Sequence, residues 1–260
     1  MPPAATPSHF NTSPPRLFVD CPMTVGETIP LDAGQTNYLV NVLRLHSGAA
    51  VLTFNGKQGE FVARIVATSR RSAHLVVEAS TREQTKPSSI TYAFAPLKHA
   101  RLDYMVQKAV EMGVAVLAPV ITRRTQVNRV NIDRMRANSI EAAEQCGILC
   151  LPDIKPAALF DGFLSGWPRG STIIFCDENA PVADPVAAIQ LRDLPVRGEI
   201  AVLVGPEGGF DPIERETLLT MPNIVQLSLG PRILRADTAA VAVLTILQAV
   251  VGDWTQNEFV

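Results

Sequence analysis

Residues 90 to 250 alternate short apolar runs with stretches in which apolar residues recur every three or four positions. This alternation predicts an α/β fold, in which helices connect the strands of a parallel sheet. The expected strands are 90–95, 114–120, 172–176, 200–204 and 224–227. The expected helices are 100–112, 133–146, 157–164, part of 181–194, one that begins at 212, and 236–250.

Residues 16 to 80 show a second pattern, with many short strands and a single helix. Such a pattern is typical of a small β-barrel. The helix is expected at 35–45, with Leu39, Val42 and Leu43 on one face and Gly48 closing it. The expected strands are 16–19, 51–54, 61–66 and 74–78, with a hairpin turn at Asn55-Gly56.

Polar segments without periodicity divide the chain. Residues 1–15 are rich in Pro, Ser and Thr and predict a disordered tail, and 253–260 form a second tail. The polar segment 81–89 predicts a linker. The expected domains are therefore a barrel at 16–80 and an α/β domain at 90–252.

Two glycine-rich corners follow the last two strands. Pro206 ends the run 200–204, Gly208 and Gly209 permit a tight turn, and Asp211-Pro212 with Glu214 starts a helix at once. The loop 228–237, with Gly230 and Pro231, repeats this arrangement before the final helix. Ligands bind at the carboxyl ends of strands in open α/β sheets, so these corners predict a binding site.

The composition of the corners favours a cationic or zwitterionic ligand over a nucleotide phosphate. Neither corner contains Gly-x-Gly-x-x-Gly or Gly-Lys-Ser/Thr, and Glu207 places a negative charge where a phosphate would sit. A single glycine corner is often only a structural turn. Two such corners in consecutive strand–loop–helix segments make a purely structural role less favoured.

Charge and cysteine content narrow the class of protein. The net charge is −2, so contact with RNA would require a local basic surface. The four cysteines, Cys21, Cys146, Cys150 and Cys176, form no Cys-x-x-Cys pair and indicate free thiols without a metal. Neither a signal peptide nor a membrane-spanning run is recognisable, which predicts a cytoplasmic protein without membrane contact.

The two corners, Gly205-Pro-Glu-Gly-Gly-Phe210 and Leu229-Gly-Pro-Arg-Ile-Leu-Arg-Ala-Asp-Thr-Ala239, resemble those of the RsmE family of 16S rRNA uridine-N3 methyltransferases, within the SPOUT superfamily. The resemblance implies a C-terminal domain threaded into a trefoil knot, which binds S-adenosylmethionine between the corners. It also implies an N-terminal PUA-like RNA-binding barrel. The implied partners are 16S rRNA in the small ribosomal subunit and a second copy of the chain.

Two other functions stay open at this point. The same cofactor would also serve methylation of another RNA position, such as a ribose oxygen or a transfer RNA base. If the two corners no longer bound a cofactor, the chain would instead be a non-catalytic RNA-binding assembly factor. The intact glycines and arginines of both corners count against the second alternative.

The cofactor is expected to contact main chain and apolar side chains, which explains glycine and leucine in the corners. The candidate cofactor residues are Leu203, Val204, Gly205, Glu207, Gly208, Gly209, Leu227, Leu229, Gly230, Ile233, Leu234, Thr238 and Ala239.

Removal of the uridine N3 proton leaves an imide anion that a guanidinium would stabilise. Arg235 and Arg232 are the candidates for this role, and Glu207 or Asp237 is the candidate proton acceptor. The alternative for both arginines is a salt bridge to Glu207 or Asp237 that ties the corners together. The family usually has Glu at the position of Asp237, so this shorter side chain is also a candidate cap of the final helix.

The resemblance places four basic residues on RNA: Arg44, Lys98, Arg123 and Arg124. Each has the alternative of a solvated surface charge. The segment Glu144-Gln145 departs from the family, because Ile148 and its neighbours stand where an arginine usually follows. The segment 177–179, Asp-Glu-Asn, is expected either to bind the ribose or amino-acid part of the cofactor or to form a turn.

Overall fold

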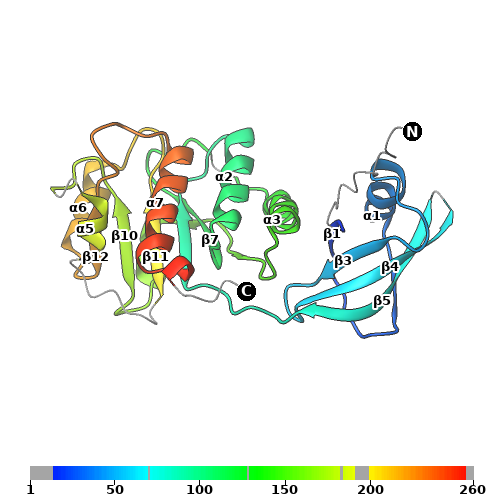
Figure 1. Ribbon diagram of the computed structural model, residues 1–260. Helices are drawn as coiled ribbons and strands as arrows, with labels where there is room; N and C mark the ends of the chain where they lie inside the picture. Colours follow the sequence, from blue (N-terminus) through cyan, green and yellow to red (C-terminus); the bar gives the residue numbers. More distant parts are fainter. Residues whose placement is uncertain (1–13, 70, 128, 182–183, 191–198, 256–260) are drawn as a thin grey trace, which may run out of the picture. The chain divides into compact units, whose positions relative to one another are not determined.

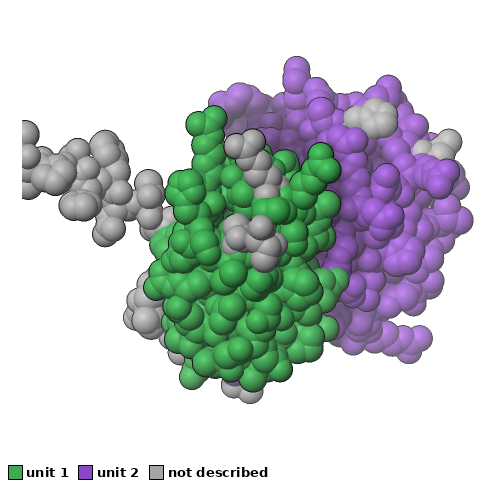
Figure 2. Space-filling model, turned by 90° about the vertical axis from the view of Figure 1, so that its right-hand side faces the viewer, with its two compact units in different colours: residues 1–84 green, residues 85–260 purple. Residues whose placement is uncertain are grey.

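The computed structural model describes residues 14–69, 71–127, 129–181, 184–190 and 199–255. The chain forms two compact units, residues 1–84 and 85–260, which Figure 2 shows in different colours. The division falls within the polar segment 81–89.

Unit 1 is built around a five-stranded sheet. Its strands are β1 (Arg16–Phe18), β2 (Thr28–Pro30), β3 (Ala50–Phe54), β4 (Glu60–Ser69) and β5 (Ser72–Arg82), in the order β1-β3-β4-β5-β2. β1 pairs with β3 in parallel and all other pairs are antiparallel. The sequence did not predict β2, because three residues ending in a proline are too short to show a period of two. Pro15, which the sequence assigned to the N-terminal tail, already contacts this sheet, because its carbonyl accepts a hydrogen bond from the Leu52 N–H.

The helix of unit 1 differs from the expected one. It consists of α1 (Ala33–Thr36) followed by a π-helical turn, η1 (Asn37–Val42). Leu39 is buried as expected, but Val42 and Leu43 are 61% and 38% exposed. The wider π-helical turn rotates these two residues away from the face that a 3.6-residue period predicts. The chain leaves the helix through Arg44, at φ +54°, rather than at Gly48.

Unit 2 contains a seven-stranded parallel sheet, which confirms the α/β class. Its strands are β6 (Ile90–Phe94), β7 (Val116–Ile121), β8 (Asp153–Ile154), β9 (Ala158–Leu159), β10 (Thr172–Cys176), β11 (Ile200–Val204) and β12 (Ile224–Leu227). The order is β12-β10-β11-β6-β7-β8, and β9 pairs with β7 beyond this path. The two-residue strands β8 and β9 were not predicted. β9 occupies the first residues of the helix expected at 157–164.

Helices cover both faces of this sheet (Figure 1). They are α2 (His99–Glu111), α3 (Ile132–Cys146), α4 (Phe160–Gly166), α5 (Pro185–Gln190), α6 (Pro212–Thr220) and α7 (Ala236–Val250), followed by the 3₁₀ turn η2 (Asp253–Thr255). One hydrophobic core joins α2, α3, α5 and α7 to one face, and another joins α4 and α6 to the opposite face. Strand residues alternate between these cores: Val202 packs in the first and Leu203 in the second.

The last helix, α7, is apolar around most of its circumference, as expected, but it is not buried all round. Ala240, Val243, Leu244 and Leu247 are buried in the core, whereas Ala249 is exposed on the opposite side. No helix in the described segments combines the length and the hydropathy needed to cross a bilayer.

The strand order determines where a site can form. β11 lies between β6 and β10, and β12 lies on the other side of β10. The carboxyl ends of β10, β11 and β12 are therefore neighbours, although the strands are separated along the chain. Both glycine corners and the segment 177–179 meet at this edge of the sheet.

Candidate active site

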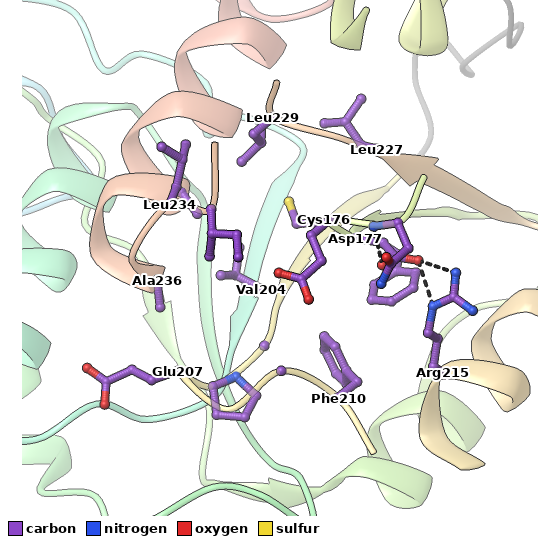
Figure 3. A pocket seen from close by; sticks show the side chains of 18 of the residues that line it. Cys176, Asp177, Val204, Glu207, Phe210, Arg215, Leu227, Leu229, Leu234 and Ala236 are labelled. Carbon is purple, nitrogen blue, oxygen red and sulfur yellow. Dashed lines mark hydrogen bonds and ion pairs between the residues drawn. The ribbon is translucent and has the colours of Figure 1, made fainter. Parts of the chain in front are cut away.

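A cavity of about 1030 Å³ opens at the carboxyl ends of β10, β11 and β12. Figure 3 shows its two walls: Glu207 and Phe210 come from the loop after β11, and Leu229 and Leu234 come from the loop after β12. Asp177 and Arg215 lie at one end of it. The volume is large enough for a cofactor of nucleoside size.

The first corner leaves no room for a side chain at Gly205. A Cβ there would lie 2.6 Å from Cε2 of Phe210. Phe210 cannot retreat easily, because its ring packs edge-on against the buried Phe175 at 5.1 Å. Gly209 closes the turn at φ +69°, and its N–H bonds to the carbonyl of Pro206 at 2.9 Å. This turn brings main chain into contact with the cavity.

The helix that follows this corner starts as its sequence indicates. Asp211 is the N-cap of α6, with Pro212 at the first turn, and Glu214 completes the capping box. The capping box fixes where the corner ends, because both carboxylates accept bonds from backbone N–H groups of the turn.

The second corner contributes the apolar wall. Gly230 has φ +97°, a conformation that favours glycine. Leu227, Leu229, Leu234 and Ala239 line the cavity beside it. This wall fits the flat apolar face of an adenine, while the glycine corners allow hydrogen bonds from main chain. The lining therefore fits S-adenosylmethionine.

An arginine outside both corners connects them. Arg101, in the first turn of α2, forms an ion pair with Glu207 and lies 3.8 Å from the Asp237 carboxylate. The sequence singled out Glu207 and Asp237 but not Arg101. Within the described segments, neither Arg232 nor Arg235 forms the salt bridge that was their alternative role.

Comparison with known proteins gives the family of this fold and cavity. The model of the RNA methyltransferase domain matches residues 84–248, and that of the RNA methyltransferase PUA domain matches residues 31–78. The chain belongs to the RNA methyltransferase family. This result confirms the predicted PUA-like N-terminal domain and shows that the chain is an enzyme.

Relatives of this methyltransferase align over nearly their whole length. Ribosomal RNA small subunit methyltransferase E from Rickettsia conorii is 29% identical, covering 88% of this chain and 93% of its own. The protein of the same name from Bacillus subtilis is 25% identical, covering 85% and 89%. The crystal structure of the Neisseria gonorrhoeae enzyme of this name, bound to S-adenosyl methionine, is 28% identical, with a TM-score of 0.82 over 93% of this chain and 100% of that one.

Most of the predicted cofactor residues of the methyltransferase line the cavity. They are Val204, Gly205, Glu207, Gly208, Gly209, Leu227, Leu229, Gly230, Ile233, Leu234 and Ala239. Leu203 does not, because it is fully buried against the opposite core. Thr238 is exposed and does not line it either. Ile233 belongs to the lining but is 84% exposed.

Three of the four residues predicted to take part in catalysis lie at the cavity. Arg232, Arg235 and Glu207 line the cavity, but Asp237 does not. Nor does Asp237 cap the final helix, since Arg235 occupies the N-cap and the Asp237 carboxylate accepts the N–H of its neighbour Thr238 at 2.9 Å.

Two of the predicted RNA residues instead contact the first corner. Arg123 donates its N–H to Glu214 at 2.8 Å and its Nη1 to Asp211 at 3.2 Å. Arg124 donates from Nη1 to the Gly208 carbonyl at 2.9 Å. Both arginines thus help to hold the corner, and a contact with RNA stays a prediction. Lys98 is exposed at the start of α2, and Arg44 is exposed in unit 1.

In the segment 177–179, which follows β10, one of the three polar side chains is engaged in hydrogen bonds within the protein. Asp177 is buried and accepts hydrogen bonds from Arg215 Nε at 2.9 Å and from Gln226 Nε2 at 2.6 Å. Its carboxylate is therefore engaged, while Glu178 and Asn179 line the cavity. Burial and the neighbouring Asp177 carboxylate raise the pKa of Cys176 to about 12, so this thiol is protonated at neutral pH.

Other features of the sequence lie away from this cavity. Glu144, Gln145 and Ile148 are not among the residues that line it. The described residues contain no group of three or more His, Cys, Asp or Glu side chains arranged as a metal site would need.

We expect Arg215→Met to lower the free energy of unfolding of unit 2 by about 2–4 kcal/mol, because it leaves the buried Asp177 carboxylate without its cation. The apparent Tm should fall by roughly 5–15 °C in a thermal melt followed by circular dichroism. Asp177→Asn provides the control, since it removes the buried charge. In that background, Arg215→Met should cost less than about 1 kcal/mol, and an undiminished cost would contradict the argument.

Proposed function

We propose that this chain transfers a methyl group from S-adenosylmethionine to N3 of a uridine in 16S rRNA, within the small ribosomal subunit. The observation that carries the proposal is the cavity between two glycine corners at the carboxyl ends of β10, β11 and β12. The relatives named small subunit methyltransferase E, and the solved relative bound to S-adenosyl methionine, support both the substrate and the cofactor.

The residues of the cavity have roles that suit this reaction. The deprotonated uridine N3 would attack the methyl carbon of a bound sulfonium in line with its C–S bond. The N–C bond would form as the C–S bond breaks, and the neutral thioether would leave. The leucines of the second corner exclude water, and the glycines let backbone approach the cofactor. The carboxylates of Glu178 and Glu207 suit the positive charge of the cofactor.

Arg235 and Arg232 are proposed to stabilise the imide anion of the uridine, since both line the cavity without an ion pair in the described segments. Glu207 is proposed as the proton acceptor. Of the two candidate carboxylates, only Glu207 lines the cavity. Arg101 then keeps Glu207 in position at the corner.

The decisive experiment supplies labelled S-adenosylmethionine and small ribosomal subunits from cells that lack the gene, then identifies the labelled nucleoside. Label in 3-methyluridine is the expected result. Label in a ribose-methylated nucleoside, or labelling of transfer RNA in a parallel reaction, would replace the target. Absence of both label and cofactor binding would favour the assembly factor.

The same proposal includes the assembly and location of the enzyme. A homodimer is supported by α7, where Ala249 remains exposed on a side that also contains the partly exposed Ala242 and Ile246. A trefoil knot and a cytoplasmic location complete the proposal, in keeping with the resemblance of both corners to SPOUT enzymes.

Lys98→Ala is expected to weaken binding to small ribosomal subunits and to reduce the slope of log affinity against log salt by about 1, because one phosphate contact is lost. Binding should be measured at several salt concentrations. Lys155→Ala is the matched control, since it removes the same charge from an exposed lysine that is already paired with Asp153. Equal slopes for both variants would argue against an RNA contact by Lys98.

A further inference from the structure

A second cavity of about 220 Å³ lies on the other side of α6 from the cofactor cavity. The helix acts as a wall between the two. Its residues Pro212, Arg215 and Leu219, spaced by three or four positions, face the large cavity, whereas Ile213 and Thr217 face the small one. The function proposed above does not use this second cavity.

The rim of the second cavity is apolar and exposed. Leu159 is 71% exposed and Ile213 is 57% exposed, and both line the cavity above the buried Phe160. Single exposed aliphatic residues are common on protein surfaces. Two of them on the rim of one depression offer an apolar surface that a ligand could cover.

Arg123 adds a planar cation to this apolar rim. Its guanidinium is held by Asp211 at 3.2 Å, and its backbone N–H is held by the buried Glu214 at 2.8 Å. The Arg123 side chain nevertheless remains 56% exposed. A guanidinium that is both anchored and accessible is suited to stack on a flat ring.

We infer that the second cavity binds an unstacked base of the RNA substrate, close in sequence to the base that enters the cofactor cavity. The volume lies below the roughly 300 Å³ typical of sites for whole ligands, so it fits a single ring system. Bases splayed out of RNA characteristically stack on aromatic rings or on the planes of arginine guanidinium groups, and Arg123 supplies such a plane here. The inference rests on the proposed function, because it takes RNA as the substrate.

Charge favours a base over a phosphate at this position. Asp161, which also lines the cavity, would repel a phosphate but can accept hydrogen bonds from the N–H groups of a base. Continuity with the cofactor cavity favours RNA over an unrelated partner. The next residue, Arg124, lines the cofactor cavity and bonds to Gly208, so the two cavities flank one corner of the chain.

We expect the double variant Leu159→Ala/Ile213→Ala to raise the KM for small ribosomal subunits about tenfold, because the apolar area that the base would cover is lost. Its kcat at saturating subunits and its Kd for S-adenosylmethionine should stay within twofold of the original. Both side chains are exposed, so the Tm should also be retained. Val186→Ala, an aliphatic truncation on α5 that touches neither cavity, is the control. An unchanged KM for the double variant would overturn the inference.

Photo-crosslinking tests the identity of the occupant directly. With p-benzoylphenylalanine placed at position 159, irradiation with small ribosomal subunits should attach the enzyme to a nucleotide of 16S rRNA near the methylated base. Attachment to a ribosomal protein alone would overturn the inference. The crosslink does not require methyl transfer, so failure of the proposed reaction and failure of this contact are separate results.

Discussion

Replacing Gly205 with alanine is expected to weaken S-adenosylmethionine binding by about 100-fold or more. The new Cβ would lie 2.6 Å from Cε2 and 2.9 Å from Cδ2 of the Phe210 ring. Real Cβ atoms do not approach carbon so closely, so the ring or the corner has to move. Overpacking of this kind costs about 1–3 kcal/mol even where neighbours can adjust.

Phe210 has little freedom to adjust. Its ring packs edge-on against Phe175 at 5.1 Å and lies 6.2 Å from Phe160, and both of these rings are buried. The contact can then be relieved by a shift of the corner's backbone or by a swing of the Phe210 ring into the cofactor cavity that it lines. This backbone lines the cofactor cavity through Gly208 and Gly209, so the strain is expressed as lost cofactor affinity.

Isothermal titration with S-adenosylmethionine, well below the Tm of each variant, measures this effect. Gly162→Ala is the matched control, because a Cβ at Gly162 in α4 would meet no atom within 4 Å. It should keep the original Kd. A Kd for Gly205→Ala within twofold of the original would show that Phe210 can move without disturbing the corner.

The sequence predicted that these corners matter but not why each glycine is needed. Pro206 and the paired glycines mark a turn from the residue types alone. Gly209 requires glycine for its backbone, at φ +69°. Gly205 requires it because of a side chain five positions later, and nothing in the local pattern reveals that the Phe210 ring folds back over it.

Elements with a clear period were predicted well, and short or irregular ones were not. The five longer strands of the parallel sheet are continuous apolar runs, so the α/β class followed from the pattern. β8 and β9 have two residues each and exist only because β7 offers them a pairing edge. The π-helical turn at Asn37–Val42 has no period of 3.6, so Val42 and Leu43 were assigned to the wrong face.

The missed site residues depend on strand order, which the sequence pattern does not contain. Arg101 reaches Glu207 because β6, which precedes its helix, pairs with β11 more than 100 positions later. Arg215 and Gln226 reach Asp177 because β12 pairs with β10. A charged residue in the first turn after a parallel strand is the one signal that would have pointed to Arg101.

Arg235→Ala is expected to lower kcat by about 100- to 1000-fold while the Kd for S-adenosylmethionine stays within twofold. A preorganised cation beside a developing anion is typically worth this much. Arg235 is exposed at the start of α7, lines the cavity and has no ion pair in the described segments, so its guanidinium is available to the uridine. Arg101, by contrast, is paired with Glu207, the proposed proton acceptor.

The pH dependence of kcat separates stabilisation of an anion from a structural role. If Arg235 stabilises the imide anion, a variant without it depends on the intrinsic ionisation of uridine N3, and its kcat should rise with pH more steeply than that of the original enzyme. Arg235→Lys keeps the charge and should recover part of the lost kcat. Arg232→Ala, measured under the same conditions, shows which of the two arginines lies nearer the base. If kcat falls by the same factor at every pH and cofactor binding is also weakened, Arg235 instead supports the structure of the second corner.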